Sequence, residues 1–461
     1  MFRKVAIIGG GAAAAALLGE LLQRPLPQPL HLDWYTGGHA PGRGVAYQTR
    51  SEHHLLNVRA ASMGMFASQP GGFLEYMQQH DPLVTGTDFL PRRRYSEYLE
   101  SELARTLQLG KSNGHAVQIL PLTVDALVPQ LNQVTVVHDG GSRPVDAAVL
   151  AVGALPAQPL AGVSAEALAS RRYVVDPWNL LNRIEQIERV PAEVVLIGLG
   201  LTAVDVLLEL SARWPRTRFV AVSRHGLLPE VHQETVPAPT DDGAMLAGDM
   251  RDAPEARRWL RLVRAAIGAG KDWRTVIDGL RPHTTTLWRE LPAPQRRRFL
   301  RHASSAWQRV RHRMPSPVHA AIASLEKSGR LQRRRGRLQS LDVVGDALLL
   351  TLRHRGALDT LNADLVIQTV GLDTDIEHTR HALLRQLLVD QHVLADPHGL
   401  GVMATTDGRL HHADGHWPNL FAIGSLMRGT LWECTAMPEI RQHACRLANQ
   451  LIGVPPVSSF Q

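Results

Sequence analysis

Two stretches of the chain share one order of apolar and small residues. In the first, the apolar run Val5–Ile8 leads into Gly-x-Gly-x-x-Ala, and a run rich in alanine and leucine continues to Leu22. In the second, Val194–Ile197 leads into the same glycine pattern, and apolar residues continue to Leu210. A short apolar run that ends at glycine predicts a buried strand, and the good helix formers after it predict a helix. The sequence therefore predicts two strand–turn–helix units.

Each glycine pattern has the spacing of a dinucleotide-binding turn. The first glycine permits the tight turn, the second lets a pyrophosphate approach the backbone, and the small third residue lets helix and strand pack closely. The N-terminus of the helix then points at the phosphates. The predicted binding residues are Gly9, Gly11 and Ala14 in the first unit, and Gly198, Gly200, Thr202 and Ala203 in the second.

The opening run has two other interpretations, a secretory signal and a membrane anchor. Arg3 and Lys4 precede the apolar stretch, as they would in a signal. However, Gly9–Gly11 interrupt the helix that a signal requires, and Glu20 ends the run before the ~20 apolar residues that span a bilayer. We therefore interpret the run as a nucleotide turn.

The strand after each unit indicates what its turn would bind. In the second unit, Phe219–Val222 ends in Ser223 and Arg224, where an arginine suits the 2′-phosphate of NADPH better than the free ribose of NADH. In the first unit, Thr36 stands where an acid is expected for the ribose, and Asp33 comes too early in the strand. Thr36 would make a weaker hydrogen bond than a carboxylate.

Three later stretches complete an α/β architecture. Residues 146–156 and 363–375 each read as an apolar strand ending in a glycine turn, and Gly345 and Asp346 centre a hairpin. A last strand, Leu420–Ile423, meets Gly424 and precedes a helix from about Pro438. The order predicts that the second unit is inserted in the first, whose sheet resumes after Asp364.

Composition and charge narrow the classes of function. The 461 residues are 44% hydrophobic and 20% charged, as in an ordinary globular protein, and no stretch is long enough to span a membrane. The net charge of +7 concentrates between Arg251 and Arg337, but no aromatic platform or zinc spacing accompanies it, so we do not expect nucleic-acid binding. Two cysteines, Cys434 and Cys445, make neither a disulfide framework nor a metal cluster, which favours the cytoplasm.

The chain resembles a bacterial family of FAD- and NAD(P)-binding flavoproteins that includes N-hydroxylating monooxygenases acting on small amino acids such as aspartate. The resemblance covers nearly the whole chain and is carried by residues 42–66 (GRGVAYQTRSEHHLLNVRAASMGMF), 272–282 (DWRTVIDGLRP) and 428–441 (RGTLWECTAMPEIR). It implies two Rossmann-like domains, with an NADPH domain and its basic helical segment inserted in an FAD domain. The expected boundaries are 1–175 and 363–461 for the FAD domain and 176–362 for the NADPH domain.

The resemblance also implies roles for individual residues. Asn57 would lie at the flavin ring or the substrate, and His53 or His54 could relay protons because imidazole titrates near neutrality. Arg281, in a turn stiffened by Pro282, would hold a substrate carboxylate through its planar fork, with Arg428 and Arg441 as further candidates. The flavin itself would be held by Gly42, Arg43, Gly44, Val45, Thr36, Gly424 and Trp432.

The activity implied is hydroxylation of the nitrogen of a small, carboxylate-bearing amine by molecular oxygen, through a C4a-hydroperoxyflavin. Two alternatives stay open: an NADPH-dependent flavin oxidoreductase that passes electrons to another acceptor, and a non-catalytic flavin- or nucleotide-binding protein. The absence of a Cys-x-x-Cys pair disfavours a disulfide reductase. We expect neither a metal nor a membrane partner, and a homodimer is possible.

Overall fold

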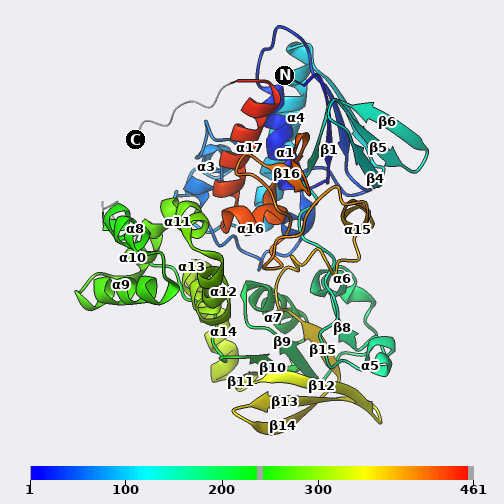
Figure 1. Cartoon of the computed structure of the whole chain (residues 1–461). Helices are drawn as coiled ribbons and strands as arrows, with labels where there is room; N and C mark the ends of the chain where they lie inside the picture. The colour runs from blue at the N-terminus through cyan, green and yellow to red at the C-terminus, as the bar shows by residue number, and fades with distance from the viewer. Residues whose placement is uncertain (1, 236–241, 455–461) are drawn as a thin grey trace.

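The computed structural model describes residues 2–235 and 242–454, and its first sheet is built around the first glycine turn. The strands lie in the order β16-β17-β7-β1-β2-β3, of which β1 and β16 are labelled in Figure 1. All neighbouring pairs are parallel except β16 and β17. The strands are β1 Lys4–Ile8, β2 His31–Tyr35, β3 Ala116–Leu120, β7 Ala147–Leu150, β16 Arg409–His412 and β17 Gly415–Ala422.

The two faces of this sheet are covered by different elements. Three helices pack on one face around a core that includes Ile7, Leu17 and Leu447: α1 Ala12–Leu22, α4 Arg92–Ser112 and α17 Met437–Leu451. The other face packs against a three-stranded antiparallel sheet and a helix: β4 Val124–Pro129, β5 Val134–His138, β6 Gly141–Val145 and α15 Ala382–Val389. Helix α1 is buried on nearly every side, which explains why its sequence is apolar all round rather than amphipathic.

A second parallel sheet is built around the second glycine turn. Its strands lie in the order β11-β10-β9-β15-β8, namely β8 Tyr173–Val174, β9 Glu193–Ile197, β10 Arg218–Ser223, β11 Leu331–Arg335 and β15 Leu365–Gln368. Helices α7 Leu201–Arg213 and α14 Ser316–Lys327 share a hydrophobic core with one face. The other face packs against the antiparallel sheet β12 Arg337–Val344, β13 Ala347–His354 and β14 Ala357–Ala363. The hairpin expected at Gly345 and Asp346 is confirmed, since this turn joins β12 to β13.

The expectation that the first sheet resumes after Asp364 is wrong. Strand β15 pairs in parallel with β9 and β8 of the second sheet, with Leu365 opposite Val194. The first sheet resumes only with β16 and β17. The expected boundaries near 175 and 363 therefore cut through the second sheet. The error arose because a buried parallel strand has the same apolar sequence in either sheet, and only tertiary pairing distinguishes the two.

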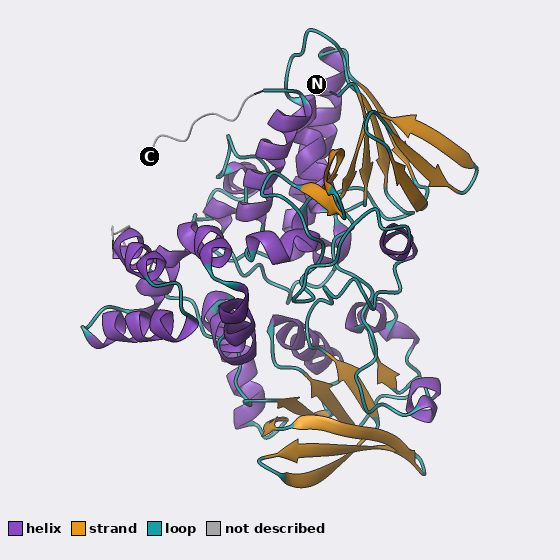
Figure 2. Ribbon diagram, viewed as in Figure 1, coloured by secondary structure: helices purple, strands orange, loops and turns teal. Residues whose placement is uncertain are grey.

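The basic stretch folds into a helical segment that Figure 2 shows as a group of helices to one side of the two sheets. It consists of α8 Asp242–Asp252, α9 Ala256–Gly268, α10 Trp273–Leu280, α11 Thr284–Glu290, α12 Ala293–His302 and α13 Ser304–Arg311. Short helices lie in the connections: α2 Gly44–Tyr47, α3 Gly72–His80, α5 Ala165–Ala169, α6 Pro177–Asn182 and α16 Arg428–Leu431.

None of the helices in the described residues is long and apolar enough to cross a membrane. Within the same residues, no group of three or more His, Cys, Asp or Glu side chains is arranged to hold a metal ion.

Buried His443 on α17 makes folding sensitive to acid. Neither ring nitrogen has a hydrogen-bond partner among the described residues, and burial lowers the pKa of His443 from 6.5 to about 4. Between these two pH values the unfolded chain binds a proton that the folded chain excludes. The contribution of neutral His443 to the free energy of unfolding is therefore fully present above pH 6.5, and it is lost as the pH falls toward the pKa of the folded state.

We expect His443→Leu to weaken this pH dependence, because leucine fills similar space and cannot bind a proton. The free energy of unfolding is measured in urea at pH 7 and at pH 5. Its decrease from pH 7 to pH 5 should be about 2 kcal/mol smaller in the variant than in the native protein. His53→Leu, which alters an exposed side chain, is the matched control. An unchanged pH dependence in His443→Leu would contradict the assignment.

Candidate coenzyme-binding site

The two glycine turns have nearly the same backbone geometry. Gly9 has φ +124° and Gly198 has φ +121°, a backbone conformation that residues with a side chain rarely adopt. A Cβ at Gly9 would lie 2.2 Å from the carbonyl oxygen of Ala151, and a Cβ at Gly198 would lie 2.2 Å from that of Thr369. These carbonyls follow β7 and β15, the strands beside β1 and β9. In both domains, glycine is required because the turn presses against the neighbouring strand.

The second glycine of each turn leaves open the N-terminus of the next helix. Gly11 caps α1 and Gly200 caps α7, and neither provides a side-chain hydrogen bond to the first helical turn. A Cβ at Gly200 would meet nothing within 4 Å among the described residues, whereas one at Gly11 would meet only Gly44, at 3.8 Å. Free backbone N–H groups at a helix N-terminus attract phosphate. The residues present therefore fit the pyrophosphates of FAD and NADPH.

The third residue of each pattern packs the helix onto its sheet. Ala14 and Ala203 have no exposed surface, and they lie in the hydrophobic cores of their respective domains. Thr202 is half-buried in the first turn of α7. The predicted roles of these residues as cofactor ligands stay predictions, but their placement around both turns is as expected.

The Gly42–Val45 loop lies directly against the first turn. The backbone N–H of Gly42 donates to the carbonyl of Gly10 (2.9 Å), and the Cα of Gly44 faces Gly11. Gly42 and Gly44 have φ of +87° and +58°, so glycine is needed at both. Arg43 donates through Nε to Glu100 (2.6 Å), while Val45 is exposed. This loop also borders a polar cavity of about 370 Å³, lined by Arg43, Gln48, Thr49, Arg50, Arg93, Ser96 and Glu97.

Two further predicted residues lie near the first turn. Thr36 is buried just after β2. Asp33 lies inside β2, 3.9 Å from Arg143, so it comes before the end of the strand, as expected from the sequence. Gly424 has φ +83° and faces Ala13 on the first turn of α1, where an added Cβ would be 3.6 Å away. The C-terminal chain thus returns to the first turn after β17.

Two exposed arginines lie at the carboxyl ends of the adjacent strands β10 and β11, at one edge of the second sheet. Arg224 follows β10, and neither it nor Arg335, at the end of the adjacent parallel strand β11, takes part in an ion pair within the described residues. The Ser223 hydroxyl accepts from the N–H of Gly226 (3.0 Å), which shapes the turn between them. Arg335 was missed from the sequence because only the pairing of Ser223 with Arg335 brings it to this edge.

The histidines of residues 42–66 separate into an exposed and a buried one. His53 is exposed, and its predicted catalytic role stays a prediction. His54 is buried and its ring bonds Thr49 and the backbone of α7. Asn57 is half-buried, and its carbonyl accepts from Nε2 of His232 (3.0 Å). Burial lowers the pKa of His232 to about 3, so this histidine is neutral.

The predicted substrate arginine Arg281 belongs to an ion-pair cluster. It donates through Nε to Glu439 (2.7 Å), and Glu439 also lies 3.4 Å from Arg311. Arg311 and Arg313 are buried, and the Nε atom of each has no hydrogen-bond partner among the described residues. These two arginines were missed from the sequence, because their burial depends on tertiary packing.

Three other candidates make contacts within the protein. Arg441 is buried, and its Nη1 donates to the carbonyls of Ser62 (2.8 Å) and Gly64 (3.1 Å), so its predicted contact with the substrate stays a prediction. Trp432 is stacked on Trp288 with ring centroids 4.7 Å apart, so its ring lies against the helical segment, and its predicted role at the flavin stays a prediction. The guanidinium of Arg428 lies over the Trp432 ring.

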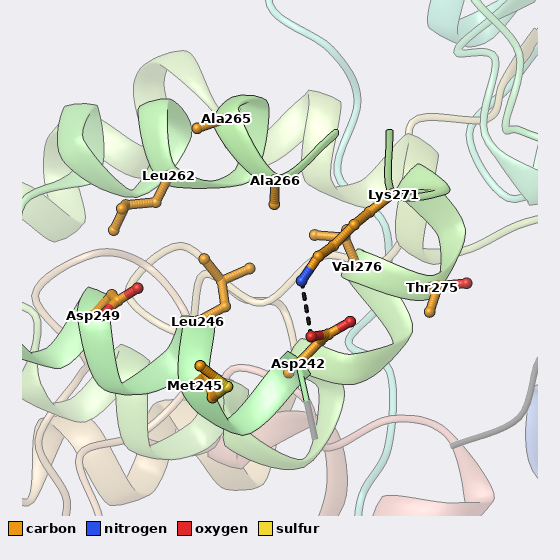
Figure 3. Close-up of a pocket in the computed structure, with 11 residues that line it drawn as sticks. Asp242, Met245, Leu246, Asp249, Leu262, Ala265, Ala266, Lys271, Thr275 and Val276 are labelled. Atoms are coloured by element: carbon orange, nitrogen blue, oxygen red, sulfur yellow. Dashed lines mark ion pairs between the residues drawn. The ribbon is translucent and has the colours of Figure 1, made fainter. Parts of the chain in front are cut away.

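The helical segment contains a separate cavity of about 250 Å³ between α8, α9 and α10 (Figure 3). Its walls are mainly apolar, and an ion pair between Lys271 and Asp242 (2.8 Å) lies at one side. None of the residues predicted to bind coenzyme or substrate lines it. The lining residues are Asp242, Gly243, Met245, Leu246, Asp249, Leu262, Ala265, Ala266, Lys271, Thr275 and Val276.

Comparisons with known proteins agree with this geometry. Residues 6–155 match the model of a family described as FAD-NAD(P)-binding, so the first domain is an FAD/NAD(P)-binding domain. No match was found among curated proteins.

Solved structures share the fold over nearly the full length. An ornithine N-hydroxylase from Kutzneria sp. 744 is 15% identical with a TM-score of 0.64, covering 98% of this chain and 99% of that chain. An L-lysine 6-monooxygenase from Pseudomonas syringae is 16% identical with a TM-score of 0.65, covering 98% and 99%. A cadaverine monooxygenase from Erwinia amylovora, solved with FAD, is 14% identical with a TM-score of 0.65, covering 99% and 96%. The expected resemblance to N-hydroxylating flavoproteins is confirmed at the level of the fold.

The arginines at the edge of the second sheet predict a coenzyme preference. Arg224→Ala should weaken binding of NADPH by roughly one to two decades, since a charge-assisted contact contributes about 1.5–3 kcal/mol. Binding of NADH, which lacks the 2′-phosphate, should change little. Dissociation constants of both coenzymes measure this, and Arg216→Ala, a change of an arginine before β10, is the control. Equal weakening of both coenzymes would contradict the assignment.

Proposed function

We propose that this chain is an FAD- and NADPH-dependent monooxygenase that hydroxylates the nitrogen of a small amine or amino acid. The observation that carries the proposal is the pair of matching glycine turns, each open at a helix N-terminus, in a fold shared with N-hydroxylating monooxygenases. A cytoplasmic location and a homodimer stay predictions from the sequence.

The two turns would hold different coenzymes. FAD would lie on Gly9–Gly11, covered by the Gly42–Val45 loop, and NADPH on Gly198–Gly200 with its 2′-phosphate near Arg224 and Arg335. Bound flavin supplies the redox chemistry with oxygen, which no side chain can provide. The protein has to bind, orient and shield the reactants.

The arginine cluster near Glu439 supports a substrate with a carboxylate. Arg281 and Arg311 come from the helical segment, while Glu439, which pairs with both, comes from the C-terminal helix α17. Arg311 also pairs with Glu433 (3.4 Å), but its buried Nε has no hydrogen-bond partner among the described residues. Leaving such a donor unpaired costs about 1–3 kcal/mol, so a ligand with an acceptor oxygen is favoured here. Glu439 holds the Arg281 guanidinium in place, which prepares it for a bidentate contact.

Transfer of electrons to another acceptor is the alternative activity. A dithiol–disulfide route is disfavoured because Cys434 is fully buried and burial raises the pKa of its thiol to about 12. An oxidoreductase of this kind would consume NADPH without forming a hydroxylamine. Product analysis therefore distinguishes the two activities.

We expect Arg281→Lys to uncouple NADPH consumption from product formation. Lysine keeps the charge but cannot provide the planar fork, so the substrate amine would be held off the flavin. Purified protein is supplied with FAD, NADPH, oxygen and a panel of aspartate, glutamate, ornithine, lysine and simple amines. Hydroxylamine formed and hydrogen peroxide released are measured per NADPH consumed, and the variant should give roughly tenfold less product with more peroxide.

Arg251→Lys is the matched control, because Arg251 forms a similar ion pair with Glu290 (2.8 Å) on the surface of the same helical segment. If the native protein oxidises NADPH but forms no hydroxylamine from any compound, monooxygenation is rejected. If only neutral or cationic compounds are hydroxylated and Arg281→Lys behaves like the native protein, Arg281 is structural.

A further inference from the structure

A single segment, residues 42–57, contacts the elements that form both coenzyme turns. Its first part lies on the first turn, where Gly42 bonds Gly10 and Gly44 faces Gly11. Its later part, from Ser51 onward, contacts helix α7, which begins immediately after the second turn. We call residues 42–57 the bridging segment.

His54 is the most buried polar contact between the bridging segment and α7. Its Nε2 bonds the carbonyl of Asp205 (3.1 Å), so Nε2 carries the proton and donates. Its Nδ1 then accepts from the hydroxyl of Thr49 (2.7 Å). Burial lowers the pKa of His54, which favours the neutral ring, and the carbonyl of Asp205, which can only accept, fixes the tautomer. The ring therefore connects the segment to the backbone of α7.

A buried ion pair reinforces this contact from α4. Arg92 Nη2 lies 2.8 Å from the carboxylate of Asp205, and the two side chains are 13% and 8% exposed. The backbone N–H of Arg92 donates to the carbonyl of His54 (2.8 Å), and its Nε donates to that of Leu55 (3.4 Å). Arg92 thus binds the bridging segment and α7 at once.

Two other contacts join the same pair of elements. The hydroxyl of Ser51 donates to Glu209 on α7, which also accepts from Arg213 (2.7 Å). Leu55 packs against the hydrophobic core of the second domain, although it belongs to the first. Polar and apolar contacts together fix the segment on α7.

The energetics of the ion pair point to a role in positioning. Apolar residues of similar size often stabilise a protein as well as a buried ion pair does, because desolvation offsets the attraction between the charges. A charged pair, however, allows few geometries. Asp205 lies in the second turn of α7, and a helix is rigid over so short a distance, so the position of Asp205 sets that of Gly200.

We propose that Arg92, Asp205 and His54 are positioning residues that set the distance between the nicotinamide and the flavin. The proposal rests on the proposed function, since it assumes FAD on the first turn and NADPH on the second. It assigns to these residues no contact with either coenzyme. Their effect on hydride transfer is exerted through the bridging segment and α7.

The test is the rate of flavin reduction in Asp205→Asn, measured anaerobically by stopped flow over a range of NADPH concentrations. The amide preserves the shape of the side chain but removes its charge. We expect the rate constant at saturating NADPH to fall roughly 10- to 100-fold, because small misplacements of reacting groups have effects of this size. The dissociation constant for NADPH should change less than about threefold, well under the tenfold of a 1.4 kcal/mol loss. Reduction by dithionite, which needs no hydride alignment, should be unaffected.

Glu185→Gln is the matched control. It also removes a carboxylate paired with an arginine of α7, Arg213, but its side chain is exposed and belongs to the second domain. It should reduce flavin at the native rate.

A double variant keeps the test decisive if Asp205→Asn loses flavin or stability. Arg92→Met combined with Asp205→Leu replaces the pair with apolar residues, which should restore folding but not alignment. Native-like flavin reduction in a folded, flavin-loaded single or double variant would overturn the positioning role. If instead the native protein binds FAD but NADPH does not reduce it, the proposed function fails, whatever the variants do.

Discussion

The structure depends on the close approach of backbone to backbone at Gly9 and Gly198. At each position a Cβ would lie 2.2 Å from the carbonyl of the adjacent strand, which is far inside any tolerable contact. The absence of side chains lets each turn close against its sheet, and the second glycine of each turn leaves the N-terminus of the next helix open. Everything else in the candidate site, including the loop over the first turn and the arginines beside the second, is arranged around these two contacts.

Two coenzyme turns act together only if their separation is controlled. Residues 42–57 contact the first turn and helix α7, and Arg92 pairs with Asp205. These contacts explain how the two sheets are held in a fixed relative position. The arginine cluster, in turn, joins the helical segment to α17 through Glu439. Polar contacts thus join the two coenzyme domains to each other and the helical segment to the C-terminal helix at the proposed substrate site.

Much of the fold could be predicted from local sequence, because the turns require glycine at fixed spacing and the flanking strands are apolar throughout. The assignment of β15 to the first sheet failed since its apolar sequence fits either sheet. Site residues were harder to predict. The importance of Arg335, Arg311 and Asp205 comes from their tertiary partners, which are Ser223, Glu439 and Arg92. His53 and His54 are adjacent in sequence, yet His53 is exposed and His54 is buried. Tertiary pairing and burial are not encoded in the identity of a single residue.

The most direct measurement of the central claim is an anaerobic titration of the purified native protein, loaded with FAD, with NADPH. The account predicts that FAD is retained, that stoichiometric NADPH bleaches the visible absorbance of the oxidised flavin, and that admission of oxygen restores it. Failure to retain FAD, or retention of a flavin that NADPH leaves oxidised, would contradict the claim that the two turns hold the two coenzymes within reach of each other.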